Sequence, residues 1–289
     1  GQYGGAIIRR STHGGLTWTT PKDNRSGQLF AEGQYHCAPV PVVVHNGRIW
    51  RAMEDRDPPE GWGSNFRSFV MSAPVEADLL NADSWTSSNR LRFDQAWRGR
   101  AWLEGNVVVT PDSKLVNILR VENKEQEIAA VVRISEDGKS VSFDPEKDFI
   151  HFFGGTNKFT IRPDPVTRRY WSLVNKQKDP DAYRNILTLV SSSDLRDWRV
   201  ESVILQHPDS EKHAFQYVDW LFEGNDVIAV SRTAYDDGLG GAHRAHDANY
   251  MTFHRIANFR ELRQTVRSDA VRRYFRHALT GTLQTSPSW

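Results

Sequence analysis

Short runs of β-branched and aromatic residues recur along this chain, and almost none of it shows helical periodicity. Turn residues separate neighbouring runs, as in His45-Asn46-Gly47 and Pro111-Asp112-Ser113. Apolar runs of this length, broken by Asn-Gly or Pro-Asp turns, predict antiparallel hairpins. The clearest runs are residues 48–54, 66–72, 115–121, 128–134, 170–174, 186–190, 217–222, 227–232 and 250–253.

The hairpins are grouped into a longer sequence repeat. Roughly every 60 residues a tight turn leads into an aromatic residue that opens the next strand, and these aromatics are Trp18, Trp85, Phe143, Trp198 and Phe259. Several strands within each period predict an all-β fold, a β-propeller of four-stranded antiparallel blades. We expect about four and a half blades in this chain and five or six in a closed ring.

The chain ends do not fit the repeat. Residues 6–10 and 17–20 read as two outer strands with no inner pair before them. We therefore expect preceding residues, the C-terminus or a second copy to complete the propeller, because open strand edges invite pairing. Residues 1–261 are predicted to form one propeller domain, and residues 262–289 a basic tail that packs on it.

The charge balance and the cysteine count exclude some classes of binding partner and of covalent cross-link. The 289 residues carry 37 basic and 36 acidic side chains, which argues against nucleic acid or an anionic membrane as a partner. Cys37 is the only cysteine, so an intrachain disulfide is excluded. No long apolar run or signal peptide is visible; if a targeting segment has been removed, a periplasmic or secreted location is favoured. We expect no cofactor.

Aromatic residues are numerous, with 10 Trp, 14 Phe and 8 Tyr. Aromatic rings stack on sugars, but they also fill the space between blades, and we expect most of them to be structural. The loop residues Trp62, Trp97 and Trp102 are the candidates for contact with a ligand.

Two turns carry a resemblance to a known family. Residues 11–18 resemble the Asp-box hairpin of sialidase-like BNR-repeat propellers, with His13 where that family has Asp, and residues 192–198 are similar to its S-x-D-L-x-x-W form. Longer strings around Tyr35, Trp102 and Ser231 resemble bacterial members of this group. The resemblance implies a propeller that acts on carbohydrate, but the Asp-box itself is structural and names no substrate.

Propeller geometry indicates where chemistry is possible. In each blade the innermost strand begins at the face where the second strand ends, so these positions converge around the axis. The candidate catalytic residues there are Glu104, Glu54, Asp219 and Tyr235; the candidate substrate-binding residues are His36, Asn106, Lys158, His213, Gln216 and Arg232, with His246 and Asp247 from the loop described next.

A polar loop interrupts the last repeat at residues 236–249. It is rich in glycine and contains His243, His246 and Asp247. It is interpreted as an ordered polar loop, a loop that closes over substrate, or a metal site. The His243-x-x-His246-Asp247 spacing lacks a third ligand at a diagnostic distance, so no metal ligands are assigned.

Three functions fit these residues. The first is a glycoside hydrolase for an oligo- or polysaccharide, with Glu104 and either Glu54 or Asp219 as paired carboxyls. The second is a lyase for a uronic acid, in which His213 or His36 is the base and Tyr235 the acid. The third is a propeller that binds carbohydrate without catalysis. A true sialidase is less favoured, because it needs three well-placed arginines.

Overall fold

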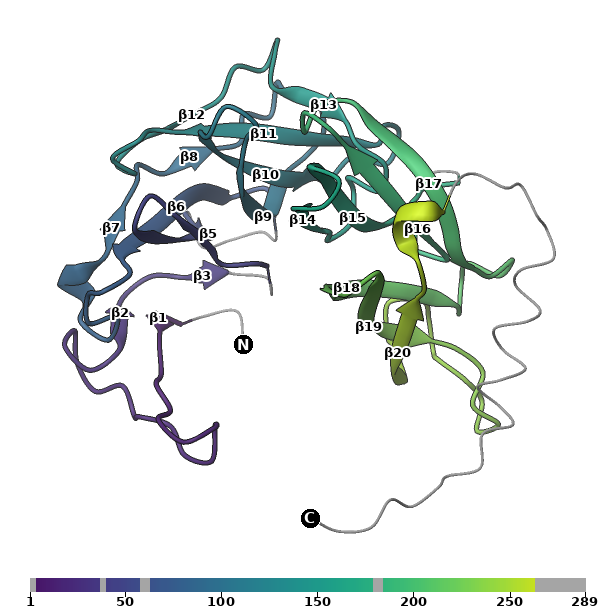
Figure 1. Ribbon diagram of the computed structural model, residues 1–289, viewed down its shortest axis with the longest axis horizontal. Helices are drawn as coiled ribbons and strands as arrows, with labels where there is room; N and C mark the ends of the chain where they lie inside the picture. The colour runs from purple at the N-terminus through teal and green to yellow at the C-terminus, as the bar shows by residue number, and fades with distance from the viewer. Residues whose placement is uncertain (1–3, 37–39, 58–62, 179–183, 263–289) are drawn as a thin grey trace.

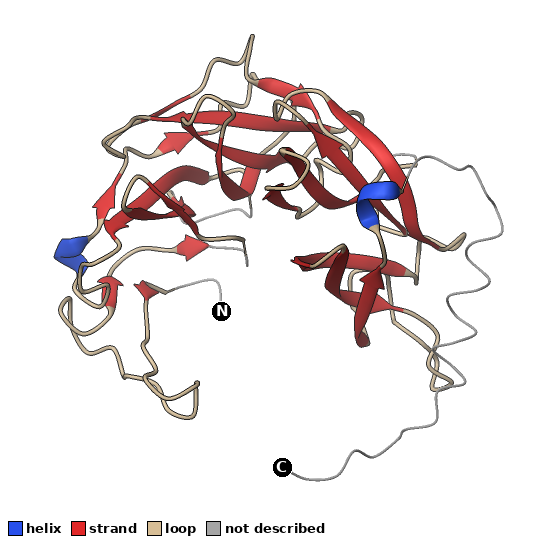
Figure 2. Ribbon diagram, viewed as in Figure 1, coloured by secondary structure: helices blue, strands red, loops and turns tan. Residues whose placement is uncertain are grey.

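The computed structural model describes residues 4–36, 40–57, 63–178 and 184–262. Its regular secondary structure is almost entirely β-strand, with two short 3-10 turns, and loops join the strands (Figure 2). The sheets are arranged as blades in an arc, with the first strand of each blade at the centre (Figure 1). The fold is therefore a β-propeller, as the repeat predicts. None of the helices in the described ranges is long and apolar enough to cross a bilayer.

Four blades and one small sheet make up the arc. The small sheet pairs β1 (Ala6–Ile7) with β2 (Gln28–Phe30). Blade 1 consists of β3 (Tyr35–His36), β4 (Val43–His45), β5 (Arg48–Arg56), β6 (Phe66–Pro74), β7 (Thr86–Ser87) and β8 (Leu91–Arg92). Blade 2 consists of β9 (Trp102–Val109), β10 (Leu115–Val121), β11 (Ile128–Ile134), β12 (Val141–Ser142) and β13 (Phe149–His151).

The third and fourth blades are simpler. Blade 3 has the order β14 (Thr160–Asp164), β15 (Arg169–Asn175), β16 (Ile186–Ser192) and β17 (Trp198–Gln206). Blade 4 has β18 (Ala214–Glu223), β19 (Asp226–Ala234) and β20 (Tyr250–Ile256). The predicted runs 115–121 and 128–134 coincide with β10 and β11, since β-branched residues flanked by turn residues mark strand ends well.

Two predicted strands are wrong. Residues 17–20 form no strand, and the partner of β1 is β2 instead. Trp18 is 56% exposed, and its indole Nε1 donates to the Gly15 carbonyl at 2.9 Å within its own turn. Phe259 begins a 3-10 turn, η2 (Phe259–Glu261), so blade 4 has three strands in the described region rather than four. A local turn pattern therefore reports the turn and not the pairing that follows.

The core consists of apolar layers between successive blades. Trp50 and Trp102 pack between blades 1 and 2, Phe159 and Trp198 between blades 2 and 3, and Trp220 between blades 3 and 4. Each blade therefore buries apolar surface against its neighbours, which no blade could do alone.

Two of the aromatics predicted to contact ligand lie in this core. Trp102 has no exposed surface, and Trp97 packs against it with ring centroids 5.4 Å apart. The prediction for Trp102 is wrong, because a fully buried ring leaves no surface on which a sugar can stack. Trp97 is only partly buried, so its contact with a ligand stays a prediction. Trp62 and the predicted tail from 263 onwards lie outside the described residues, and the single-domain boundary stays a prediction.

The turns that resemble Asp-boxes are self-contained. Ser192 Oγ accepts a hydrogen bond from the Leu195 N–H at 2.9 Å, and Asp194 Oδ1 accepts two more from Arg196 and Asp197, each at 2.8 Å. Ser11 Oγ likewise accepts from the Gly15 N–H at 2.9 Å. These bonds stiffen the turns locally and leave the axis of the propeller to other residues.

Candidate functional site

Polar residues converge where the second strands end. Glu54 on β5 is opposite His36, Arg120 on β10 is opposite Leu103, and Arg232 on β19 is opposite Gln216. Asn175 takes the corresponding place at the end of β15. We call the group around this convergence the axial cluster. It consists of His36, Glu54, Glu104, Arg120, Lys158, Arg162, Tyr217, Asp219 and Arg232.

Two innermost strands are distorted at the same place. β9 and β18 each have a register shift, and Glu104 (φ 57°) and Tyr217 (φ 52°) lie there in the left-handed region. Glu104 directly follows Leu103, the residue paired with Arg120 in blade 2. Tyr217 directly follows Gln216, the residue paired with Arg232 in blade 4. A β-bulge re-aims a side chain, and left-handed backbone at a residue other than glycine is a strain that functional sites retain.

Glu54 holds the blade 1 side of the cluster. Its side chain is 1% exposed; Oε2 lies 3.2 Å from His36 Nδ1, and Oε1 accepts from the Gly105 N–H at 3.0 Å. Burial acts to lower the pKa of His36, but the hydrogen bond and charge of Glu54 raise it above its ordinary value overall. Both oxygens of this carboxyl are therefore engaged within the protein.

Glu104 and Arg120 form a buried ion pair. Arg120 NH1 donates to Glu104 Oε2 at 2.5 Å, and both side chains are less than a tenth exposed. Burial acts to lower the pKa of Arg120, but the Glu104 charge and hydrogen bond outweigh it and raise the pKa. The negative charge of Glu104 is therefore held beside a permanent positive charge.

Lys158 lies just before β14 and links blade 3 to blade 4. Its Nζ donates to Thr160 Oγ1 and to the Val218 carbonyl, each at 2.8 Å. Burial lowers the pKa of Lys158 from 10.5 to about 8, opposed by the charges of Asp219 and Glu104. Asp219 is half exposed and lies 3.2 Å from Arg162 NH2. Carboxylates from two blades thus act on the same ammonium group.

The blade 4 side is built around Tyr217. The guanidinium groups of Arg232 and Arg184 lie 4.9 Å and 5.6 Å from the centre of its ring. Arg232 NH2 also donates to the His246 carbonyl at 3.0 Å, which ties the 236–249 loop to the cluster. Gln216 reinforces this tie, since its Nε2 donates to the carbonyls of Ala245 at 2.6 Å and His246 at 3.1 Å.

Several predicted site residues join blades together. Asn106 Nδ2 donates to the Phe159 carbonyl at 3.2 Å, and its Oδ1 accepts from the Ile161 N–H at 3.2 Å. Asn175 Nδ2 donates to the Phe215 carbonyl at 2.5 Å. These bonds satisfy strand groups that otherwise face the gap between sheets. Contact of Asn106 or Gln216 with substrate stays a prediction, since the structure shows only their internal roles.

A second cluster lies beside the axial cluster. His213 Nδ1 is 2.8 Å from Asp209 Oδ2, and the His213 ring stacks on His207 with centroids 3.6 Å apart. Tyr235 packs edge-on against His213 at 4.9 Å. Burial, and then the Asp236 charge, raise the pKa of Tyr235. His213 and Tyr235, predicted for the axial site, therefore belong to this neighbouring group.

The 236–249 loop is ordered by its own polar contacts. Asp247 Oδ2 accepts from Arg244 Nε at 2.8 Å, and Asp237 Oδ1 accepts from the Leu239 N–H at 2.7 Å. The His246 side chain lies 3.5 Å from Asp247 Oδ1, and its ring is edge-on to Tyr217 at 6.1 Å. The interpretation as an ordered polar loop fits these contacts.

Sequence reasoning missed several residues that the structure assembles. Tyr217 had no signal, because nothing in the sequence marks the register shift at β18. His207 and Asp209 did have a sequence signal, because the spacing His207-x-Asp209-x-x-x-His213 places three potential metal ligands in one short loop. Arg162 is not among the residues predicted for the site, yet it contacts Asp219.

A cavity lies at blades 2 and 3, near the ends of their second strands, β10 and β15. Its volume is about 590 Å³, and residues after β10 and β15 contribute to its lining. Lining residues include Arg98, Lys124, Glu127, Phe149, His151 and Gln177. No member of the axial cluster lines it, so we place the chemistry by the converging charges and not by this cavity.

Comparisons with known proteins support the fold. No protein-family profile matches this chain, and no curated protein is similar to it in sequence. A mutant fructofuranosidase of Schwanniomyces occidentalis, complexed with fructosylnystose, is 12% identical with a TM-score of 0.53, and the alignment covers 93% of this chain and 49% of that one. A mutant levansucrase of B. subtilis is 10% identical with a TM-score of 0.50, over 74% and 64% of the two chains.

A GH32 beta-fructofuranosidase of Bombyx mori is 14% identical, with a TM-score of 0.48 and coverage of 75% of this chain and 46% of that one. This chain thus spans about half the length of the two fructofuranosidases. Likeness at such low identity concerns the fold alone: this chain has a β-propeller fold that is also found in glycoside hydrolases. The closer resemblance to sialidase-like BNR propellers stays a prediction.

Proposed function

We propose that the protein is a glycoside hydrolase that acts on an oligo- or polysaccharide at the axial cluster, with Glu104 and Asp219 as its two carboxyl groups. The observation that carries the proposal is their shared neighbour, Lys158. Its Nζ donates to the carbonyl of Val218, the residue before Asp219, at 2.8 Å, and the charge of Glu104 from blade 2 also acts on its pKa. Glycoside hydrolysis needs two carboxyls on either side of one bond.

The surroundings give the two carboxyls different roles. Glu104 is buried and paired with Arg120, so we assign it the ionised role, as nucleophile or as the group that activates water. Asp219 also pairs with an arginine, Arg162, but this carboxyl is half exposed, so a leaving-group oxygen can displace the arginine and take its place; we assign Asp219 the acid role. The glycosidic C–O bond breaks as Asp219 gives its proton to that oxygen, and water supplies the new hydroxyl.

Other members bind or position. Glu54 has both oxygens engaged with His36 and Gly105, so we assign it a positioning role and not a catalytic one. Arg232 lies over the Tyr217 ring, an arrangement suited to gripping sugar hydroxyl or carboxylate groups beside a stacking surface. The oligosaccharide complex of the structurally similar fructofuranosidase supports the substrate class but does not identify the sugar.

A glycan panel with chromatographic detection tests the proposal. We expect hydrolysis of one substrate class, and a fall in kcat of about 10²–10⁴-fold in both Glu104→Gln and Asp219→Asn. Glu136→Gln, in an exposed outer turn, is the matched control and should keep full turnover.

Three results would contradict this proposal. Products with an unsaturated ring that absorbs in the near ultraviolet would show a lyase instead. Retained glycan binding with no product, in the wild type and in both variants, would show a binding propeller. Full turnover in both carboxyl variants would remove the chemistry from the axial cluster.

A further inference from the structure

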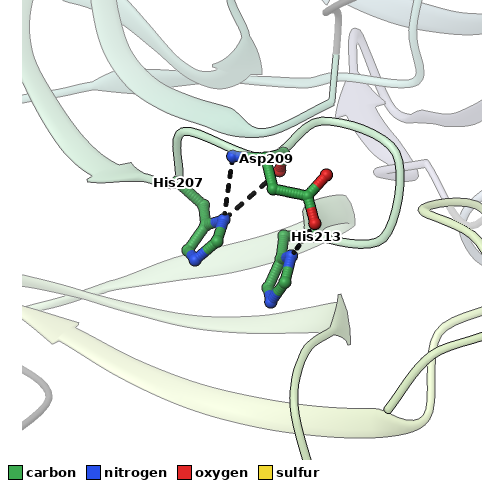
Figure 3. A group of neighbouring side chains, drawn as sticks. All are labelled: His207, Asp209 and His213. Carbon is green, nitrogen blue, oxygen red and sulfur yellow. Dashed lines mark hydrogen bonds and ion pairs between the residues drawn. The ribbon is translucent and has the colours of Figure 1, made fainter. Parts of the chain in front are cut away.

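The second cluster has the composition of a metal site. His207 directly follows β17 and His213 directly precedes β18, so the short loop between these strands brings both imidazoles together with Asp209 (Figure 3). One potential ligand atom from each of these residues lies within 4.8 Å of the others. Two imidazoles and a carboxylate form a nitrogen and oxygen donor set that suits Zn²⁺ among biological metals.

One separation within this group is slightly shorter than that of neighbouring ligands on one ion. His213 Nδ1 is 2.8 Å from Asp209 Oδ2. With metal–ligand bonds of about 2.0–2.1 Å, two tetrahedral ligand atoms lie roughly 3.3 Å apart. A small outward shift of the Asp209 carboxylate therefore replaces the hydrogen bond by two bonds to a metal ion.

The opposite nitrogen of His213 supports this assignment. His213 is 5% exposed, and its Nε2 is buried without a hydrogen-bond partner among the described residues, 3.5 Å from Asp236 Oδ1. Histidines that ligate metals usually donate their other ring N–H to a carboxylate, which fixes the tautomer. Asp236 stands where that carboxylate is required, and a slight approach completes the bond.

We propose that His207, Asp209 and His213 bind a divalent transition-metal ion, Zn²⁺ in the first instance, with Asp236 orienting His213. Three protein ligands leave a fourth position for water. The site joins the loop before β18 to the loop after β19, which is already held by the hydrogen bond from the Ala245 N–H to the Glu211 carbonyl at 2.5 Å. The ion thus stiffens the segment whose carbonyl groups hold Arg232 and Gln216.

This proposal does not depend on hydrolase activity, because its test measures binding. Tag-free protein treated with a chelator and dialysed is titrated with ZnCl₂ in a calorimeter. We expect one Zn²⁺ per chain. His213→Ala and Asp209→Asn should each weaken binding at least 100-fold, and Asp236→Asn should weaken it about 10–100-fold, as expected for an outer partner.

His243→Ala is the matched control. His243 is exposed and lies in the 236–249 loop, so unchanged binding in this variant separates the proposed site from a site on that loop. If His243→Ala abolishes binding while His213→Ala does not, the proposal is overturned. Failure of the wild type to take up zinc would overturn it as well.

A measurement on the wild type guards against variants that fail to fold. X-ray absorption at the zinc edge should show two imidazoles and oxygen donors, and Co²⁺ in place of Zn²⁺ should give the visible absorption of a four-coordinate site. A zinc spectrum with oxygen donors alone would contradict ligation by His207 and His213. Zinc should also raise the Tm of the wild type but not that of Asp209→Asn, which keeps the size of the side chain.

Discussion

The two sides of the axial cluster use the same strand positions differently. On the side of blades 1 and 2, Glu54, Glu104 and Arg120 are all buried, and each is engaged by a partner in another strand. On the side of blade 4, Asp219 is half exposed and Arg232 rests on an aromatic ring. Corresponding positions thus build a rigid wall on one side and an accessible surface on the other.

Burial decides what each charge contributes. A buried pair such as Glu104 and Arg120 holds its geometry because separation leaves an uncompensated charge in a poorly hydrated site. An exposed group such as Asp219 has little to lose when a ligand replaces its partner. We therefore expect the first side to set the shape of the site and the second side to contact substrate.

The largest expected effect is on stability. Arg120→Met leaves the Glu104 carboxylate buried without its partner, and we expect the free energy of unfolding to fall by about 3–5 kcal/mol. Arg232→Met, at the corresponding position of blade 4, should cost about 1 kcal/mol or less. Urea unfolding of both variants measures the difference. Equal losses would show that the two sides do not differ as described.

Lys158 sharpens the comparison through pH. Its pKa is about 8 in the folded protein and near 10.5 in the unfolded chain. Between these values the unfolded state binds more protons, so this lysine makes the free energy of unfolding rise with pH, by an amount on the order of 3 kcal/mol. Below pH 8 the cost of burying the charged amine is fully present.

The measurement is a difference between two proteins. Wild type and Lys158→Met are unfolded in urea from pH 7 to pH 10. All other titrating groups are common to the two proteins, so their contributions cancel in the difference between the two free energies of unfolding. We expect the wild type to gain stability relative to the variant above pH 8. A constant difference over this range would mean that Lys158 is not desolvated.

Asn106 tests the contacts between blades. Asn106→Ala removes the partner of the Phe159 carbonyl and of the Ile161 N–H, and we expect a loss of about 1–3 kcal/mol because both groups are then buried unsatisfied. Asn89→Ala is the matched control, because it removes the same side chain. Asn89 Oδ1 also accepts a hydrogen bond from another blade, from the Val141 N–H, but at the outer part of blade 2. A smaller loss in Asn106→Ala than in the control would contradict an important role near the axis.

The smallest effect is a shift in one titration. The pKa of His36 should lie above its ordinary value of 6.5 because Glu54 outweighs the effect of burial. This pair stabilises the fold fully below pH 6.5, and its contribution is lost as pH rises through the raised pKa. NMR titration of the imidazole should show the raised value, and Glu54→Gln should lower it. An unchanged pKa in Glu54→Gln would exclude the pair.

Local sequence patterns predicted strands well and pairing less well. Residues 115–121 became β10 because β-branched residues between two turns leave few alternatives. Residues 17–20 look as strand-like, yet they form no strand, since β2 takes the place beside β1. Strand pairing depends on distant residues, which a local pattern does not contain.

The candidate site divides in the same way. Convergence of Glu54, Glu104 and Arg232 follows from the repeat and from strand direction, so the sequence was enough to group them. The bulges that re-aim Glu104 and Tyr217 carry no sequence signal that we recognised. His213 shows the opposite error, because a residue placed at the start of β18 packs with His207 rather than with the axial charges.

The order of apolar and polar residues by itself determined the propeller, most of its strands and the axis on which polar ends converge, because alternation and turn chemistry act over a few neighbouring residues. Only the tertiary structure decided which converging groups are buried in pairs and which stay exposed. That choice depends on the packing of one blade against the next, and so on residues far apart in the chain.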